Sequence, residues 1–428
     1  MKLNLREAEQ RQTMNNSLTK QQARRLILAH QGLWPPHKLE GKPGIVNYIR
    51  RVGCIQFDPL DIVGHNPELV LQARVADFSP EMLQELLYQD RKLVDGWDKV
   101  MSIYRVEDWP YFRRQREAER RSLDKRSQIT TILPQVRQMI EERGPLSSID
   151  LDMDHQVDWP WGPTRLARAA LEGMQFCGEL VIHHRVHTRK VYDLASRHIP
   201  QKLLSAPDPN ETDEQYQDWH ILRRIGGIGL VWNRAGEAWL GIQGVKSKER
   251  SAALRRLTER GEAIEVHVEG IEPPLYVRSM DEARLDVALQ SDIPPRAVIL
   301  APLDNLLWDR RLVRELLDFS FVWEVYKPVE QRKYGYYVLP VLYGDRFIAR
   351  FEPGRDRQSG ALEIKNWWWE PGIAPSKRMQ SDLCDCFKRF LGYLGTDELK
   401  IESKTAKQAD IHWLTATTRS TRRKPWKR

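Results

Sequence analysis

The sequence predicts an α+β protein with three tandem winged-helix units, a small C-terminal β-barrel and a closing helix. The first observation is repetition, because helices followed by a glycine, a strand, a polar turn and a second strand recur along the chain. The second is a change from Ala297 onward to short strands at regular spacing, which is typical of a small barrel. The third is the length of 428 residues, which is too great for one compact core.

The middle unit, residues 111–205, shows the repeated pattern most clearly. The spacing of apolar residues predicts a helix over Ile129–Arg143, and Gly144 and Pro145 end it. A second helix is predicted from Gly162 to about Phe176. Two strands joined by a basic turn follow, Leu180–Ile182 and Val191–Leu194. This is the order that a recognition helix and its wing require.

The units on either side repeat this order. In the third unit, residues 206–291, the predicted helices are Glu214–Ile225 and the basic Lys246–Arg260, and the hairpin strands are Ile264–Val268 and Leu275–Val277. The first unit, residues 17–110, is less regular. Its predicted helices are Thr19–Gln31, Lys42–Val52 and Pro80–Tyr88; its strands are Cys54–Phe57, Lys92–Asp95 and Val100–Tyr104.

The remaining segments flank these units. For residues 292–395 the predicted strands are Val298–Pro302, Val322–Tyr326, Tyr336–Tyr343, Arg346–Phe351 and Ala361–Ile364, and the closing helix is Lys377–Leu391. We expect residues 1–16 to be disordered and residues 396–428 to form a C-terminal segment with a basic tail. A disordered, solubilising end explains the tail as well as an anion-binding arm does.

Composition restricts the class of protein. The net charge is +8 and the isoelectric point about 9.2, which make an anionic partner plausible. The four cysteines do not form a disulfide framework in a chain of this length, and none has zinc-ligand spacing. His183, His184 and His187 lie close together, but no carboxylate or cysteine partner is evident from their spacing, so we expect no metal. Without a signal peptide or a membrane span, the expected location is the reducing cytoplasm.

The segment Gly53–Leu60 contains the strongest candidate for chemistry. On a strand, Gln56 and Asp58 face one side while Ile55 and Phe57 face the other. Pro59 restricts Asp58 to an extended backbone. A carboxylate held in this way can stabilise a developing oxocarbenium ion or orient a water that the neighbouring amide holds. A simple Asp-Pro turn with an exposed Gln56 is the other interpretation.

Several motifs together resemble the winged-helix DNA glycosylases of the AlkZ and YcaQ type. They are Gln56-Phe57-Asp58, Arg50–Ile55, His65–Leu71, Val191–Leu194, Leu300–Arg310 and Arg332–Pro340. The resemblance covers roughly residues 17 to 395. That family excises N7-alkylated purines and unhooks interstrand crosslinks, and it carries a Gln-apolar-Gln or Gln-apolar-Asp motif after an N-terminal helix. The resemblance therefore implies that Gln56 and Asp58 are catalytic.

Two departures from the family pattern concern the substrate and the barrel. Gly96–Met101 replaces an aromatic-His-Glu-Ala run near the presumed lesion pocket, and Asn305 stands where proline is usual. The residues that the resemblance places near that pocket are His65, Trp97, Asp98 and Lys99. The first departure leaves the range of lesions open.

The function that the resemblance implies is a monofunctional glycosylase of base excision repair that needs no cofactor. A positively charged N7-alkylpurine is a good leaving group, so Asp58 would offset charge on the sugar while a water held by Gln56 and Asp58 attacks the anomeric carbon. The expected partner is duplex DNA with alkylated purines, bound by a monomer. A transcriptional regulator without enzymatic activity is the alternative, and a lyase that uses Lys99 is a weaker one.

Contacts to DNA are expected from basic residues on the predicted recognition helices and wings, mostly to phosphates. The candidates are Arg165, Arg168, Arg185, Arg189, Lys246, Lys248, Arg250 and Arg255. Each one alone is more often a solvated surface charge than a contact, so the prediction depends on their clustering.

Overall fold

A computed structural model describes residues 17–36, 39–242, 244–283, 293–356 and 358–418. The chain forms two compact units. The discontinuous unit comprises the described residues within 1–79 and 221–428, and the continuous unit is Pro80–His220. The predicted disordered N-terminus and the basic tail from Arg419 lie outside the described residues. The boundaries predicted near residues 110, 205 and 292 stay a prediction.

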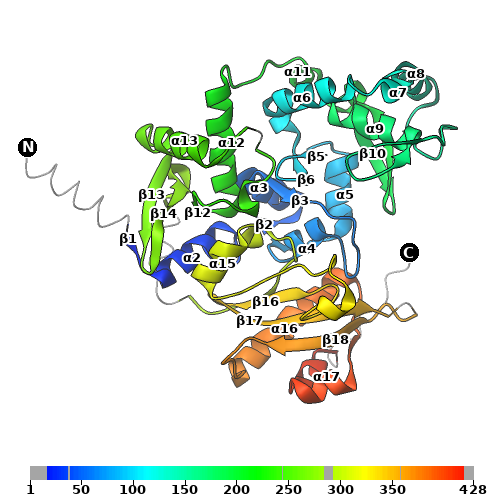
Figure 1. The fold of residues 1–428 in the computed structure, drawn as a ribbon. Coiled ribbons are helices and arrows are strands. Elements are labelled where there is room, and N and C mark those ends of the chain that lie inside the picture. The colour runs from blue at the N-terminus through cyan, green and yellow to red at the C-terminus, as the bar shows by residue number, and fades with distance from the viewer. Residues whose placement is uncertain (1–16, 37–38, 243, 284–292, 357, 419–428) are drawn as a thin grey trace, which may run out of the picture. The chain divides into compact units, whose positions relative to one another are not determined.

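The predicted α+β class is confirmed, since helices and sheets build both units (Figure 1). The helices of the discontinuous unit are α2 (Lys20–His30), α3 (Gly41–Val52), α4 (Asn66–Gln72), α13 (Ser247–Glu259), α15 (Arg310–Leu317), α16 (Lys377–Leu394) and α17 (Ser403–Gln408), and α12 (Asp213–Ile228) enters it from the continuous unit. The apolar residues of α3 explain its position, because Ile45, Tyr48 and Ile49 recur at helical spacing and are fully buried.

The C-terminal part of the discontinuous unit is a five-stranded sheet in the order β15-β16-β17-β18-β19. Its strands are β15 (Ala297–Ile299), β16 (Leu339–Tyr343), β17 (Arg346–Arg355), β18 (Leu362–Trp369) and β19 (Leu399–Ile401). The sheet curls into a half-barrel rather than the predicted barrel, and α16 packs against β15 (Figure 1). The predicted strand Val322–Tyr326 is wrong. That segment is a loop in which Val325 is buried, Val322 and Tyr326 are exposed, and Glu324 accepts a hydrogen bond from the Tyr334 N–H.

A second sheet of the discontinuous unit has the order β1-β13-β14-β12. Its strands are β1 (Ser17–Leu18), β12 (Val231–Trp232), β13 (Ala263–Val268) and β14 (Ile271–Arg278). The hairpin β13–β14 follows the basic helix α13, as the sequence predicts. Two short strands, β2 (Leu39–Glu40) and β4 (Val75–Ala76), pair in parallel, and β3 (Cys54–Gln56) follows α3.

The continuous unit contains two more hairpins that follow helices. The antiparallel pairs are β5 (Leu93–Trp97) with β6 (Met101–Arg105), and β10 (Leu180–Val186) with β11 (Arg189–Leu194), which β7 (Leu146–Ser147) extends. The helices are α5 (Pro80–Tyr88), α6 (Arg113–Leu123), α7 (Ser127–Thr130), α8 (Leu133–Arg143), α9 (Leu166–Phe176), α10 (Ala195–His198) and α11 (Gln201–Leu204). The number of winged-helix units stays a prediction.

The core of the continuous unit lies around α9. The apolar spacing predicts a buried face of Leu166, Ala169, Ala170 and Met174; the last three are fully buried and Leu166 is half-buried. The helix predicted over 129–143 is divided, because α7 ends at Thr130 and α8 begins at Leu133. Every helix among the described residues is too short or too polar to cross a membrane.

Candidate functional site

The Gln56-Phe57-Asp58 segment lies where β3 ends. The strand stops at Gln56, so strand pairing does not extend to Asp58 as the alternation argument assumed. The alternation of burial nevertheless continues, since Ile55 and Phe57 are buried while Gln56 and Asp58 are half-buried. The two buried side chains anchor the segment and leave the amide and the carboxylate partly accessible.

The carboxylate of Asp58 is fixed by the backbone that follows it. The Leu60 N–H donates a hydrogen bond to Oδ1 at 2.9 Å, which closes an Asx turn across Pro59. Burial raises the pKa of Asp58, while this hydrogen bond and the positive charge of His65 act to lower it. The turn fixes the orientation of the carboxylate and leaves capacity on it, since a carboxylate offers about four acceptor sites.

His65 and Phe57 connect this segment to α4. Their rings stack with centroids 5.9 Å apart and an angle of 21° between the planes. The His65 N–H donates to Oε2 of Glu68 at 2.9 Å, and this capping box begins the helix. The helix start therefore positions the imidazole beside the catalytic motif predicted from the sequence.

Two tyrosines from the sheet side of the unit lie near Asp58. Burial raises the pKa of Tyr337, and the negative charge of Asp58 acts in the same direction on both Tyr337 and Tyr326. Tyr337 is buried, whereas the side chain of Tyr326 is 83% exposed. Neither tyrosine was among the site residues predicted from the sequence. For Tyr337 the sequence contains a signal, because it belongs to the tyrosine-rich run Tyr334–Tyr337.

Two asparagine side chains hold the backbone of β3. Nδ2 of Asn66 donates to the Gln56 carbonyl at 2.8 Å, and its Oδ1 accepts from the Leu303 N–H at 3.0 Å. Nδ2 of Asn305 donates to the Cys54 carbonyl at 3.0 Å. Asn305 is the residue that departs from the family pattern. Its buried side-chain amide donates a hydrogen bond to β3, and a proline at this position would have no N–H to donate.

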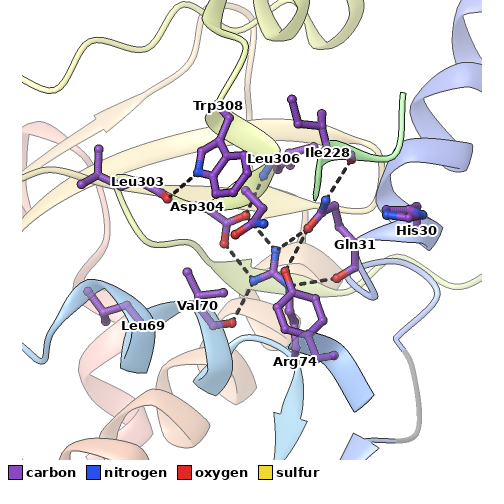
Figure 2. A network of polar contacts seen from close by, with 12 residues as sticks. His30, Gln31, Leu69, Val70, Arg74, Ile228, Leu303, Asp304, Leu306 and Trp308 are labelled. Atoms are coloured by element: carbon purple, nitrogen blue, oxygen red, sulfur yellow. Dashed lines mark hydrogen bonds and ion pairs between the residues drawn. The ribbon is translucent and has the colours of Figure 1, made fainter. Parts of the chain in front are cut away.

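Asp304, the residue before Asn305, forms a buried ion pair with Arg74 (Figure 2). The guanidinium donates two parallel hydrogen bonds to the carboxylate, both of 2.8 Å, and further ones to the carbonyls of Gln31 and Val70. The Asp304 carboxylate also accepts from the Leu306 N–H at 3.0 Å. The pair therefore fixes the turn that presents Asn305.

Three of the lesion-pocket candidates belong to the continuous unit, and His65 belongs to the other. Trp97 ends β5 and lines a cavity within its unit. Asp98 is buried with one oxygen 3.5 Å from Nε2 of His220. Lys99 is also buried, which disfavours the lyase alternative because a Schiff-base amine must reach the sugar.

His183 has the carboxylate neighbour that the sequence spacing did not reveal. His183, Asp193 and His198 each bring a ligand atom within 4.8 Å of the others. Asp193 already accepts hydrogen bonds from His198 at 2.7 Å and from Arg197 at 2.9 Å. Since Arg197 and the nearby Arg91 add positive charge, the surroundings of this cluster disfavour a divalent cation.

The basic residues predicted to contact DNA fall into two groups, those that are buried or held by a partner and those that are more accessible to solvent. Arg185 is paired with Asp95 at 2.7 Å, and Arg250 is buried against Trp239. A phosphate contact would require either to leave its partner. The others are exposed or half-buried: Arg165, Arg168, Arg189, Lys246, Lys248 and Arg255. Arg165 pairs with Asp154 and Arg168 with Glu172, whereas Lys246 and Lys248 lie at the start of α13.

Comparison with known proteins supplies the context for this geometry. The family described as DNA glycosylase AlkZ-like matches residues 49–393. A solved structure of DNA glycosylase AlkZ from Streptomyces sahachiroi is similar with a TM-score of 0.60 at 14% identity, over 90% of this chain and 99% of that one. Both findings confirm the resemblance seen in the motifs, and the second shows that the fold is shared.

Proposed function

Because this chain belongs to the AlkZ-like DNA glycosylase family, it acts on DNA in repair, and we propose that it hydrolyses the N-glycosidic bond of N7-alkylated purines. The observation that carries this proposal is the position of the Asp58 carboxylate, two residues after Gln56. It is half-buried just after β3 ends, and a hydrogen bond from the Leu60 N–H fixes it. A carboxylate held in place and partly shielded from water suits a reaction that develops positive charge on a sugar.

In the proposed reaction the N-glycosidic bond breaks first and its electron pair goes to the alkylated base, which leaves as a neutral purine while the positive charge passes to the sugar. Asp58 then stabilises the oxocarbenium ion, and a water oriented by Asp58 and the Gln56 amide attacks the anomeric carbon. The water loses a proton to the carboxylate or to solvent, and the sugar keeps a hydroxyl group. No lysine nucleophile takes part, so the enzyme is monofunctional.

The substrate is proposed to be duplex DNA, bound by a monomer in the cytoplasm without a cofactor. Exposed Lys246 and Lys248 at the start of α13, and exposed Arg189 at the start of β11, are proposed to contact phosphates. The proposed substrates include interstrand crosslinks joined through a purine N7, since they carry the same positively charged leaving group.

The proposal is tested with duplex DNA that contains a single N7-methylguanine. We expect the purified protein to release 7-methylguanine and leave one alkali-labile site without added metal. Asp58→Asn and Gln56→Ala should lose release and keep binding to the same duplex. Asp61→Asn is the matched control, because this exposed carboxylate also closes a turn, through the Gly64 N–H at 2.9 Å.

Other outcomes would identify other functions. Tight binding to one DNA sequence without base release would indicate a transcriptional regulator. Borohydride trapping of a covalent protein–DNA adduct would indicate a lyase and would remove the monofunctional part of the proposal. Release that persists unchanged in Asp58→Asn would exclude Asp58 from the chemistry.

A further inference from the structure

The discontinuous unit contains a cavity of about 710 Å³ whose wall includes charged side chains of both signs. Arg296 lies directly before β15, and Arg389 is on α16. Glu40 ends β2, and Asp77 directly follows β4. Segments that are far apart in the sequence thus bring two basic and two acidic residues to one cavity within one unit.

The two arginines form a pair of like charges. Helix α16 packs against β15, and Nη2 of Arg389 donates a hydrogen bond to the Ala297 carbonyl at 3.2 Å, which holds this guanidinium beside the start of the strand. Arg296 is half-buried, and burial together with the positive charge of Arg389 lowers its pKa. The two guanidiniums therefore lie close enough to repel each other.

This pair of arginines lacks a counter-charge among the described residues. Neither Arg296 nor Arg389 forms an ion pair with a carboxylate of that part of the chain. The nearby Cys386 does not balance them, because burial raises the pKa of its thiol and keeps it neutral. Arg74 lines the same cavity, but the Asp304 carboxylate balances its charge. A bound anion would remove the repulsion between the two unbalanced guanidiniums.

The acidic residues occupy a different part of the wall. Strands β2 and β4 pair in parallel with Glu40 opposite Ala76, so Glu40 and Asp77 lie at neighbouring strand ends. Both side chains are exposed, and the Glu40 carboxylate does not cap the helix α3 that follows it. Since they form no ion pair with the two arginines, the cavity has separate basic and acidic parts.

Two adjacent guanidiniums match the chemistry of a phosphate monoester. Such a group carries about −1.5 to −2 charges at neutral pH and offers three acceptor oxygens. A guanidinium donates paired hydrogen bonds to phosphate oxygens. A carboxylate has one charge and two oxygens, and in this protein Arg74 alone satisfies the carboxylate of Asp304. A phosphodiester of the DNA backbone has only one negative charge, so it matches the pair less well.

We propose that this cavity binds a small phosphate monoester, with the phosphate on Arg296 and Arg389. The carboxylates of Glu40 and Asp77 would accept hydrogen bonds from hydroxyl or amino groups at the other end of the ligand. The volume lies within the roughly 300–1,000 Å³ of small-molecule sites. This site does not depend on the proposed glycosylase reaction, since neither Gln56 nor Asp58 is among its described lining residues.

Isothermal titration calorimetry of the full-length protein tests the site with four probes. In phosphate-free buffer of low ionic strength, inorganic phosphate should give saturable heat, and ribose 5-phosphate should bind more tightly through its hydroxyl groups. Ribose and dimethyl phosphate, a singly charged diester, should give none. Arg389→Gln should weaken the binding of inorganic phosphate at least about tenfold, as the loss of a hydrogen bond to a charged group does. Glu40→Ala should reduce the advantage of ribose 5-phosphate over inorganic phosphate.

Arg378→Gln is the matched control. Arg378 is an arginine of the same helix whose side chain is 65% exposed, and its distance to Asp382 is 3.9 Å. This variant should bind phosphate like the original protein. Arg389 is also exposed, so Arg389→Gln should fold. Inorganic phosphate should raise the melting temperature of the original protein and of Arg378→Gln, and should leave that of Arg389→Gln unchanged.

Three outcomes would overturn the proposed site: no saturable heat with either phosphate probe, unchanged phosphate binding in Arg389→Gln, or equal affinity for dimethyl phosphate and inorganic phosphate. Arg389→Gln should also bind duplex DNA like the original protein. A variant that loses affinity for the duplex and keeps its affinity for inorganic phosphate would assign Arg389 to the DNA backbone and contradict the proposal. Release of 7-methylguanine by the same preparations tests the proposed function separately, and Arg389→Gln should retain it.

Discussion

Burial makes the ionised carboxylate of Asp58 less favourably solvated in the folded chain than in water, and this raises its pKa. A group whose folded pKa is raised contributes stability below its unfolded pKa, and that contribution is lost as pH rises through the folded pKa. At neutral pH the ionised Asp58 therefore destabilises the fold. Asp58→Asn removes the charge and keeps an oxygen for the Leu60 N–H.

We predict that Asp58→Asn raises the melting temperature at neutral pH while base release falls by about 100-fold or more. The difference in melting temperature from the original protein should shrink as pH falls through the folded pKa of Asp58. Thermal unfolding at a series of pH values measures it. Asp61→Asn should change neither property, and a less stable Asp58→Asn with normal release would indicate that Asp58 serves the turn alone.

The acidic side of the pH–rate profile should depend on His65. Base release requires an ionised Asp58, so the rate should fall as pH drops through a pKa above the ordinary value of a carboxyl group. The charge of His65 lowers this pKa. His65→Asn removes that charge and places a favourable capping residue at the start of α4, so we predict that the acidic limb moves to higher pH.

Single-turnover release of 7-methylguanine at each pH measures this shift without interference from product release. The rate on the alkaline side of the limb should change less than the position of the limb. An acidic limb that stays in place in His65→Asn would show that another group controls it.

At the scale of elements, the Arg74–Asp304 pair connects the end of α4 to the turn before α15 that presents Asn305. Both side chains are fully buried. Asp304→Asn leaves the guanidinium buried without its counter-charge, which typically costs about 3–5 kcal/mol. We predict a loss of stability of that order, measured as a lower urea midpoint for the discontinuous unit.

The control is Glu315→Gln, which breaks the more exposed pair with Arg311 on α15. Exposed pairs contribute about 0–1 kcal/mol, so its midpoint should change little. Equal midpoints for the two variants would show that the buried pair does not hold this part of the fold together.

The elements that the sequence predicted well are those whose apolar spacing is decisive. The helix Pro80–Tyr88 has the predicted bounds, because Leu83, Leu86 and Leu87 form one buried face. Helix α6 was missed because its sequence is almost entirely polar and only Leu123 is buried. The strand predicted over Val322–Tyr326 failed because the apolar pattern does not match the burial: Val322 and Tyr326 are exposed, whereas Glu324 is buried.

The candidate site was predicted in part for the same physical reason. Gln56 and Asp58 are neighbours in the sequence, so a strand pattern was enough to associate them. Asn66 and Leu303 are 237 residues apart, and Asn305 and Cys54 are 251 apart. Local spacing carries no information on such contacts, and they depend on how the whole unit folds.

For the whole molecule, the net charge of +8 implies that DNA binding depends on phosphates and on salt. We predict that the double variant Lys246→Ala, Lys248→Ala binds duplex DNA more weakly, whatever its sequence. Each lost phosphate contact should reduce the slope of log K against log salt by about 0.9, so the double variant should lose up to about 1.8. Fluorescence anisotropy with duplexes of unrelated sequence over a salt series measures both quantities.

Lys388→Ala is the control for this prediction, since Lys388 is an exposed lysine of α16 that already pairs with Asp385 at 3.1 Å. Its slope should equal that of the original protein. A double variant that weakened binding to one sequence alone would instead indicate base-specific reading by α13, the behaviour of a regulator. An unchanged slope would remove the start of α13 from the DNA interface, and the exposed Arg189 at the start of β11 would be the next residue to replace.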